Sequence, residues 1–314
     1  MIFNKNGEGS EELYQISGTF QASTNFASIA AEVDYAQREV ASVVGGELMD
    51  VAEVIYAKET PTADEAAFLL AVQRPAAYLA IAGYSKLTGL SHGDTGRKIK
   101  TDENEKIPFE WMIDRDDREM RERYFRALDS LFSFLDSADP ASDWGAAWSE
   151  SEAKKTAASL VVKSIRDVET VYPLEHSGYM YHMLTPVIRE IQNTKLRDIV
   201  GQDRLRLLIE GDESVSDIRS QALRFTVLLA IVTAVQRWSV EVFPLSVARR
   251  FYPSYQGNRE SRHASTSEID WFIGKINLQI KDAELEMKTI IAGNPYEGMD
   301  PIPENSPRNK YFTV

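Results

Sequence analysis

Hydrophobic residues recur along this chain at spacings of three and four, which is the period of an amphipathic α-helix. The clearest run lies between residues 26 and 44 and comprises Phe26, Ile29, Val33, Ala36, Val40 and Val44. Gly45-Gly46 follows it, and glycine readily adopts the backbone conformations that end a helix. The same period predicts a short helix from Ser10 and helices over about 47–58, 62–81, 108–136, 151–171, 183–200, 202–210, 215–242 and 266–291. We therefore predict an all-α fold.

The two halves of the chain repeat one order of signals. Val43-Val44-Gly45 ends a helix in the first half, and Ile199-Val200-Gly201 ends one in the second. A short helix, a long apolar helix and a polar loop follow each glycine; the loops are 88–106 and 244–265. The next long helix opens with Trp111-Met112-Ile113 or with Trp271-Phe272-Ile273. This repetition predicts an internal duplication, although helical proteins also repeat helix–loop–helix units by chance.

The predicted organisation is two tandem helical modules, 1–140 and 141–293, followed by an extended tail, 294–314. Four prolines fall in the tail, namely Pro295, Pro301, Pro303 and Pro307. Proline lacks a backbone N–H and interrupts helices, so an extended path is expected there.

Composition excludes several classes of protein. About 43% of the 314 residues are hydrophobic, enough for one large core or two smaller ones. There are no cysteines, which excludes disulfides, thiolate metal sites and cysteine nucleophiles. The net charge is −13, which argues against binding nucleic acid over the whole surface because phosphate would be repelled.

Targeting and membrane signals are not evident in the sequence. The first residues lack the apolar core of a signal peptide. The most apolar run, Phe225 to Val235, is eleven residues long, and a membrane-spanning helix needs about twenty. We expect a protein without membrane contact, located in the cytoplasm or assembled from it.

No pattern typical of catalysis or of a cofactor stands out. The four histidines are dispersed and form no ligand motif. The acids between Glu110 and Glu119 alternate with arginines, so a solvated face with local ion pairs is the simplest interpretation. Gly93-Asp94-Thr95-Gly96-Arg97-Lys98 lacks the residue order of a phosphate-binding loop. We predict no catalytic, metal-binding or cofactor-binding residues.

Candidate interface residues lie in the two polar loops and the tail. They are Arg97 and Lys98 in the first loop, Arg249, Arg250, Phe251 and Tyr252 in the second, and Tyr311 and Phe312 in the tail. Arginine and aromatic residues are enriched in protein interfaces, and mixtures of them also bind single-stranded nucleic acid. The alternatives left open are solvated loops and a tail that folds back on its own module.

Several segments resemble an uncharacterised protein family encoded in phages and prophages of Bacteroidetes. They are Met1-Ile2-Phe3-Asn4-Lys5, Thr95-Gly96-Arg97-Lys98, Asp102-Glu103-Asn104-Glu105-Lys106, Phe109-Glu110-Trp111-Met112-Ile113-Asp114-Arg115-Asp116 and Tyr124 with Arg126-Ala127-Leu128-Asp129. The resemblance spans most of the chain and is strongest between residues 92 and 136. The helix pattern is also similar to that of phage head–tail connectors, which stack as rings beneath the portal. Those connectors have a single module, so the resemblance leaves the ring stoichiometry open.

Three functional hypotheses follow. The first is a non-enzymatic virion protein, a head–tail connector or neck adaptor, that forms a homo-oligomeric ring and contacts portal or tail proteins, with at most non-specific proximity to DNA. The second is a cytoplasmic helical binding protein with a groove between its modules. The third is a metal-dependent enzyme that uses the acids between Glu110 and Asp117.

Overall fold

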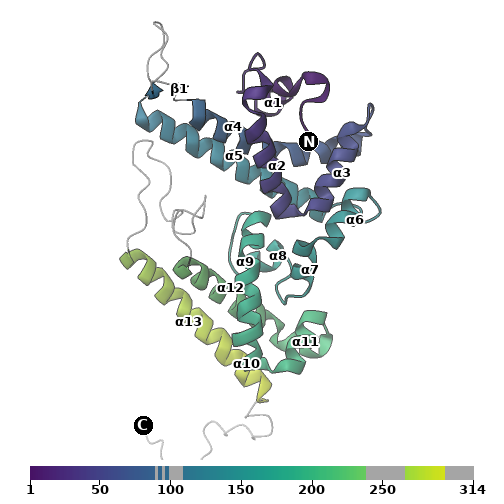
Figure 1. Cartoon of the computed structure of the whole chain (residues 1–314). Helices are drawn as coiled ribbons and strands as arrows, with labels where there is room; N and C mark the ends of the chain where they lie inside the picture. Colours follow the sequence, from purple (N-terminus) through teal and green to yellow (C-terminus); the bar gives the residue numbers. More distant parts are fainter. Residues whose placement is uncertain (89–90, 94–95, 99–108, 238–265, 294–314) are drawn as a thin grey trace, which may run out of the picture.

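The computed structural model of the chain describes residues 1–88, 91–93, 96–98, 109–237 and 266–293. Over these residues the fold is all-α apart from one small β-hairpin, which confirms the predicted fold class. The described residues form two hydrophobic cores. Residues in the range 2–148 build one core, and residues in the range 160–287 build the other. We call the two bodies module 1 and module 2; they form the upper and lower halves of Figure 1.

Module 1 is built around three long helices. Its elements are η1 (Lys5–Gly7), α1 (Gly9–Ser17), η2 (Phe26–Ser28), α2 (Ala30–Val44), α3 (Gly46–Ala57), α4 (Ala63–Thr88), β1 (Ser91–Gly93), β2 (Gly96–Lys98) and α5 (Glu110–Asp136). Helices α4 and α5 pack together as a hairpin, and α2 lies against α4. Two short helices follow, α6 (Asp143–Glu150) and α7 (Glu152–Ala158). Trp148 of α6 belongs to the core of module 1, although it lies beyond residue 140.

Module 2 presents the same order of long elements. It comprises α8 (Ile165–Glu169), α9 (Gly178–Ile191), η3 (Gln192–Leu196), α10 (Arg197–Val200), α11 (Gln202–Glu210), η4 (Glu213–Val215), α12 (Ser216–Arg237) and α13 (Thr266–Ile291). Helices α12 and α13 pack as a hairpin against which α9 lies, as α2 does in module 1. The C-terminal ends of α4 and α12 and the N-terminal ends of α5 and α13 lie at the left of Figure 1.

Two glycines make the same bend at corresponding places. Gly45 lies between α2 and α3 with φ 104° and ψ 147°, and Gly201 lies between α10 and α11 with φ 81° and ψ 162°. A side chain would strain the backbone at these positive φ values. The predicted helix ends at these residues are therefore confirmed, with a physical reason for glycine at both.

A buried glutamine holds an irregular segment in each module. In module 1, Gln37 Oε1 accepts a hydrogen bond from the Ile2 backbone N–H at 2.8 Å. In module 2, Gln192 Oε1 accepts one from the Val161 backbone N–H at 2.7 Å. Each amide satisfies a backbone donor that burial would otherwise leave without a partner.

The two segments continue alike. Two and three residues after Ile2, the backbone N–H groups of Asn4 and Lys5 donate to the carboxylate of Glu12 on α1. The backbone N–H groups two and three residues after Val161 donate in the same way to the carboxylate of Asp167 on α8. The correspondence between the modules thus begins at the segments 2–5 and 161–164, well before the helices that the sequence comparison aligned.

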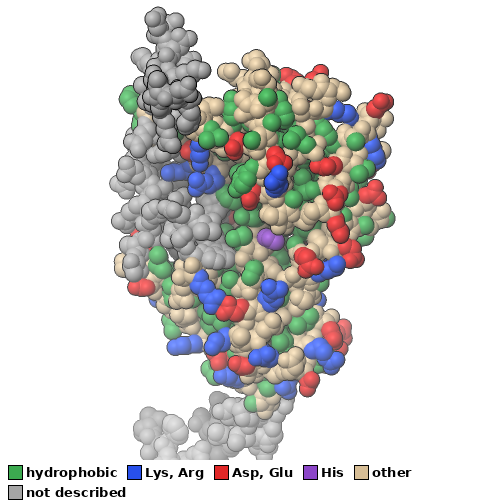
Figure 2. All heavy atoms as spheres, in the orientation of Figure 1, with side chains coloured by type: hydrophobic (Ala, Val, Ile, Leu, Met, Phe, Trp, Pro, Cys, Tyr) green, Lys and Arg blue, Asp and Glu red, His purple; other side chains and the backbone are tan. Residues whose placement is uncertain are grey.

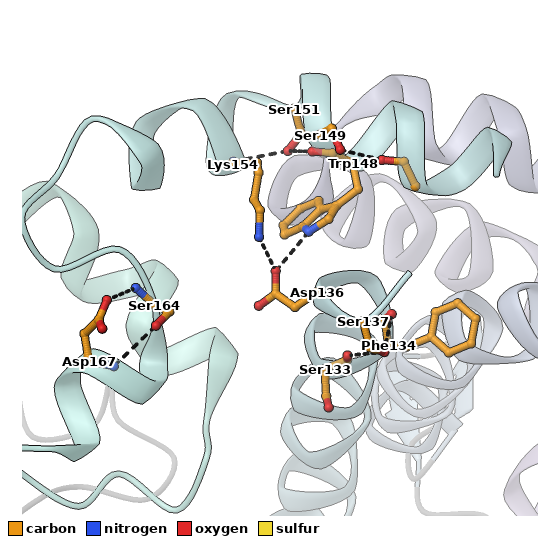
Figure 3. A network of polar contacts seen from close by, with 11 residues as sticks. Ser133, Phe134, Asp136, Ser137, Trp148, Ser149, Ser151, Lys154, Ser164 and Asp167 are labelled. Carbon is orange, nitrogen blue, oxygen red and sulfur yellow. Dashed lines mark hydrogen bonds and ion pairs between the residues drawn. The ribbon is translucent and has the colours of Figure 1, made fainter. Parts of the chain in front are cut away.

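The predicted helix 151–171 is wrong, because the structure divides it into α7 and α8 with an irregular segment between them. Leu160, Val161 and Val162 are buried in the core of module 2. The chain bends after α7 ends at Ala158, and Gln192 holds the Val161 backbone N–H where these side chains enter the core. Ser164 then caps α8 by a capping box with Asp167, shown in Figure 3.

Asp136 ties the end of α5 to the short helices that lead to module 2. Its Oδ1 accepts hydrogen bonds from Trp148 Nε1 at 3.1 Å and from Lys154 Nζ at 2.7 Å. Figure 3 shows both donors converging on this one carboxylate oxygen. The Trp148 ring also packs edge-on against Phe132, with ring centroids 5.7 Å apart. This network fixes where the chain leaves module 1.

Candidate interaction surface

The interface residues proposed from the sequence fall mostly outside the described part of the chain. Arg97 and Lys98 lie on β2, where their backbones pair with His92 and Ser91 of β1. A small β-hairpin therefore lies within the predicted first loop. The other six candidates, Arg249, Arg250, Phe251, Tyr252, Tyr311 and Phe312, lie outside the described residues.

The first turn of α5 carries exposed apolar side chains. Phe109 is 67% exposed, Trp111 58%, Ile113 48% and Met112 41%. A pocket of about 560 Å³ opens beside them; the described residues that line it are Trp111, Met112, Arg115, Asp116, Glu119 and Arg123. Exposed apolar groups gathered in this way are typical of interaction surfaces.

Helix α13 carries a second exposed apolar surface, which we call the α13 stripe: Trp271, Leu278 and Leu285. These side chains are 59%, 58% and 66% exposed. Their spacing of seven residues places them on one face of the helix. The buried residues of α13, namely Ile276, Ile280, Ala283 and Met287, face α12 and the core of module 2. The stripe therefore lies on the side of the helix away from its own core.

The corresponding side of α5 is covered within the chain. Phe125 packs against Tyr179 with ring centroids 5.4 Å apart, and Phe132 packs against His182 at 5.7 Å. Asp129 Oδ1, between these two rings, accepts hydrogen bonds from Ser177 Oγ at 2.8 Å and the Tyr179 N–H at 3.1 Å. We call this contact between α5 and the start of α9 the module junction.

Gly178 allows the module junction to close. A Cβ atom at this position would lie 2.6 Å from Phe132 Cβ, which is too close for any real side chain. The preceding residue, Ser177, caps α9 by accepting a hydrogen bond from the Met180 N–H. The predicted start of this helix near Met183 was therefore too late. Ser177 was the readable capping signal.

Burial changes the acid–base properties of the module junction. It raises the pKa of Asp129, and the hydrogen bonds from Ser177 and Tyr179 offset the rise only in part. Burial lowers the pKa of His182, because the protonated ring would lose its hydration. Neither residue was a candidate site residue in the sequence, because neither belongs to a motif typical of catalysis or binding.

The acidic part of α5 pairs with nearby bases. Glu119 pairs with Arg123 and Glu122 with Arg126, each one helical turn apart, as the sequence predicted for this face. Lys86 Nζ of α4 lies 3.7 Å from Asp117 Oδ2. Among the described residues, no three His, Asp or Glu side chains are grouped as a metal site would require.

Two helical stretches are long and apolar enough to cross a membrane, judged by length and composition alone: Ala63–Thr88 and Glu213–Arg237. The sequence analysis considered only the eleven-residue run inside the second. The most apolar windows of the two stretches are 44% and 56% buried within the fold. The central helices of soluble proteins share these properties, so this feature alone is only weak evidence for a membrane-spanning helix.

Charge is distributed unevenly over the surface. On the face shown in Figure 2, acidic side chains gather at the right of module 1, over α3 and α6.

The chain was compared with known proteins. No family model, no curated protein and no solved structure matches it.

Proposed function

We propose that this chain is a non-enzymatic assembly protein of a phage or prophage, a head–tail connector or neck adaptor built from two copies of one helical module. The α13 stripe is the observation that carries the proposal. It places large apolar side chains on the outside of module 2, and around Leu285 they lie on a side of the helix that is covered in module 1, at Phe125 and Asp129. Such a surface is suited to binding protein rather than to chemistry.

The duplication is supported by contacts that lie far apart in sequence. The pairs Gln37–Ile2 and Gln192–Val161 have the same geometry, and the same bend follows each glutamine at Gly45 and Gly201. Repetition of this hydrogen bond together with the glycine bend is harder to obtain by chance than repetition of helix order.

The acidic composition suits a protein placed near DNA in transit. A net charge of −13 repels phosphate, so a channel with such a wall would not hold passing DNA. The resemblance of residues 92–136 to a phage-encoded family points in the same direction. The proposed partners are further copies of the chain and portal or tail proteins, in the host cytoplasm or the virion.

A deletion experiment tests this function. Removing the gene from the phage or prophage that carries it should yield DNA-filled heads and separate tails, with few joined particles by electron microscopy. Supplying the gene in trans should restore joining. Normal particle yields without the gene would contradict the proposal. Genes for portal, terminase and capsid proteins next to this one would support it.

A helical binding protein with a ligand groove between the modules is the second candidate. The described contacts of the module junction favour it less, because Phe125, Phe132 and Tyr179 pack directly against one another or against neighbouring side chains there. A binding protein of this kind should remain a monomer at high concentration.

A further inference from the structure

The contact between the modules suggests how two copies of the chain meet. In module 1, the side of α5 defined by Phe125, Asp129 and Phe132 is covered by the first turn of α9. These residues are spaced four and three apart, so they form one face of the helix. In module 2, α13 takes the place of α5, and its matching face carries exposed Leu285.

Both ways of aligning the modules put Leu285 on this face. Counted from the tryptophan near the start of each helix, Leu285 corresponds to Phe125. Counted from Gly45 and Gly201, it corresponds to Asp129. The two alignments differ by four residues, which is about one helical turn, so they describe the same side of the helix.

We propose that the face of α13 around Leu285 binds module 1 of a second copy, in the place that the first turn of α9 takes on α5 within one chain. This inference rests on the proposed assembly function and names its first partner. The contact is heterologous, because α13 of one copy meets a different surface on the next. A heterologous contact continues from copy to copy and closes as a ring or extends as a filament.

The alignment at the two glutamines points to a surface on module 1 that has the sequence position of the α9 start but not its helix, because α2 begins only at Ala30 whereas α9 begins at Gly178. Counted back from Gln192 and Gln37, Ser177 corresponds to Ala22, Tyr179 to Thr24 and His182 to Ala27. Ala22 and Ala27 are exposed and Thr24 is half-buried. Small side chains at these positions leave room for the Leu285 side chain. Leucine cannot accept the hydrogen bonds that Asp129 accepts, so this contact would be apolar.

A symmetric contact is the competing arrangement. The seven-residue spacing of Trp271, Leu278 and Leu285 is also that of a coiled-coil seam, so two α13 helices could pair with each other. Two copies would then satisfy the surface completely, and no larger assembly would follow. The heterologous contact is favoured because the corresponding face of α5 already binds the other module inside the chain.

Chemical cross-linking distinguishes these arrangements. The natural sequence contains no cysteine, so only introduced cysteines can react. The full-length Ala22→Cys/Leu285→Cys double variant would be treated with a short bis-maleimide and examined on a denaturing gel. We expect a ladder of dimers, trimers and larger species. The Leu285→Cys single variant should give little dimer. The control is Ala22→Cys/Val54→Cys, because Val54 of α3 is 63% exposed but lies on no proposed contact.

Three results would overturn the proposal: no ladder in the double variant, an equally strong ladder in the Val54 control, or efficient dimers from Leu285→Cys alone. Circular dichroism would establish that each variant is folded, which is expected because the replaced side chains are exposed. Cross-linking reports only on self-association. A missing ladder with separated heads and tails in the gene deletion would therefore reject this contact and leave the proposed function standing.

Discussion

Gln192 reaches the backbone N–H of Val161 across thirty-one positions of the chain and accepts its hydrogen bond at 2.7 Å. Gln37 does the same for Ile2 across thirty-five positions at 2.8 Å. Both glutamine side chains are buried. An amide that replaces water for a buried backbone donor is a structural element of each module, and it gives the two modules a common origin point for comparison.

Replacing either glutamine by leucine should destabilise the chain. Gln37→Leu and Gln192→Leu keep an apolar side chain of similar length but leave a buried N–H without an acceptor, which costs about 1–3 kcal/mol. Urea titration followed by circular dichroism would measure the free energy of unfolding. Gln15→Leu is the control, because Gln15 is exposed on α1 and should change stability little. Equal stability of all three variants would contradict the role of the amides.

The π-helical turn η3 leads to a prediction about deletion. Eight positions separate Gln37 from Gly45, whereas nine separate Gln192 from Gly201. A π-turn accommodates one extra residue within a helix, and η3 begins at Gln192. Deleting exposed Asn193 should therefore convert this turn to α-helix, restore the spacing of module 1 and leave a folded protein.

The matched deletion removes exposed Arg38 from α2, which contains no π-turn. It would rotate Val40 and Val44 by about 100° away from the core. Thermal melts should show a much larger loss for the Arg38 deletion than for the Asn193 deletion. Comparable losses would contradict the interpretation of η3 as an inserted residue.

Helix positions were readable from the sequence where one face is apolar and the ends carry clear signals. Helix α13 occupies the predicted range 266–291, and Gly45 and Gly201 stop helices as expected. The irregular segment around Val161 was not readable, because a short apolar run is compatible with a buried helix as well as with a non-helical segment. Its acceptor, Gln192, is distant in sequence and belongs to no motif.

The candidate surface was predicted in kind but not in place. The sequence analysis selected basic and aromatic residues of the loops and the tail, and six of these eight residues lie outside the described structure. The α13 stripe was missed because Leu278 and Leu285 fit a helical pattern equally well as core residues. Only the position of α12 decides that Ile276 and Ile280 face inward instead.

Leu228 and Ile231, inside the apolar run from Phe225 to Val235, are buried, each with 2% of its surface exposed. Truncating either to alanine should cost about 2–5 kcal/mol, because burial is lost and a cavity remains. Leu278→Ala is the control, since its side chain is mostly exposed. Calorimetric melts of the three variants would measure the difference, and a control as damaging as the core variants would contradict the assignment.

His182 should make stability depend on pH. Its pKa is lowered in the folded chain by burial, so the unfolded chain binds a proton more readily. The stabilisation is present above the unfolded pKa of about 6.5 and is lost as pH falls through the lower folded value. Between about pH 7.5 and about pH 5.5, the wild type should therefore lose stability relative to His182→Gln.

Urea titrations at both pH values would measure this difference. Asp129 also titrates at the module junction, and its raised pKa acts in the opposite direction. Both proteins retain Asp129, so its effect cancels in the comparison. A constant difference between the two proteins across this range would show that His182 does not titrate differently on folding.

We predict that the tail, residues 294–314, is an arm that binds a neighbouring subunit or partner protein through Tyr311 and Phe312. Deleting residues 294–314 should leave the melting temperature of the isolated chain nearly unchanged and impair assembly. Serine at both anchor positions should have the same effect if these rings make the contact. A large loss of stability on deletion would favour a tail that folds back, and normal assembly would reject the arm.

The central claim is that this chain associates with itself through α13. Static light scattering across a range of protein concentrations tests it most directly, comparing the wild type with Leu285→Asp and with Val54→Asp as a matched exposed control. We predict that the wild type and the Val54 variant rise in mass above the 35.4 kDa of one chain, towards a closed or extending assembly, whereas Leu285→Asp stays at one chain. A wild type that remains at 35.4 kDa at every concentration, or a Leu285→Asp variant that associates as fully as the wild type, would contradict the claim.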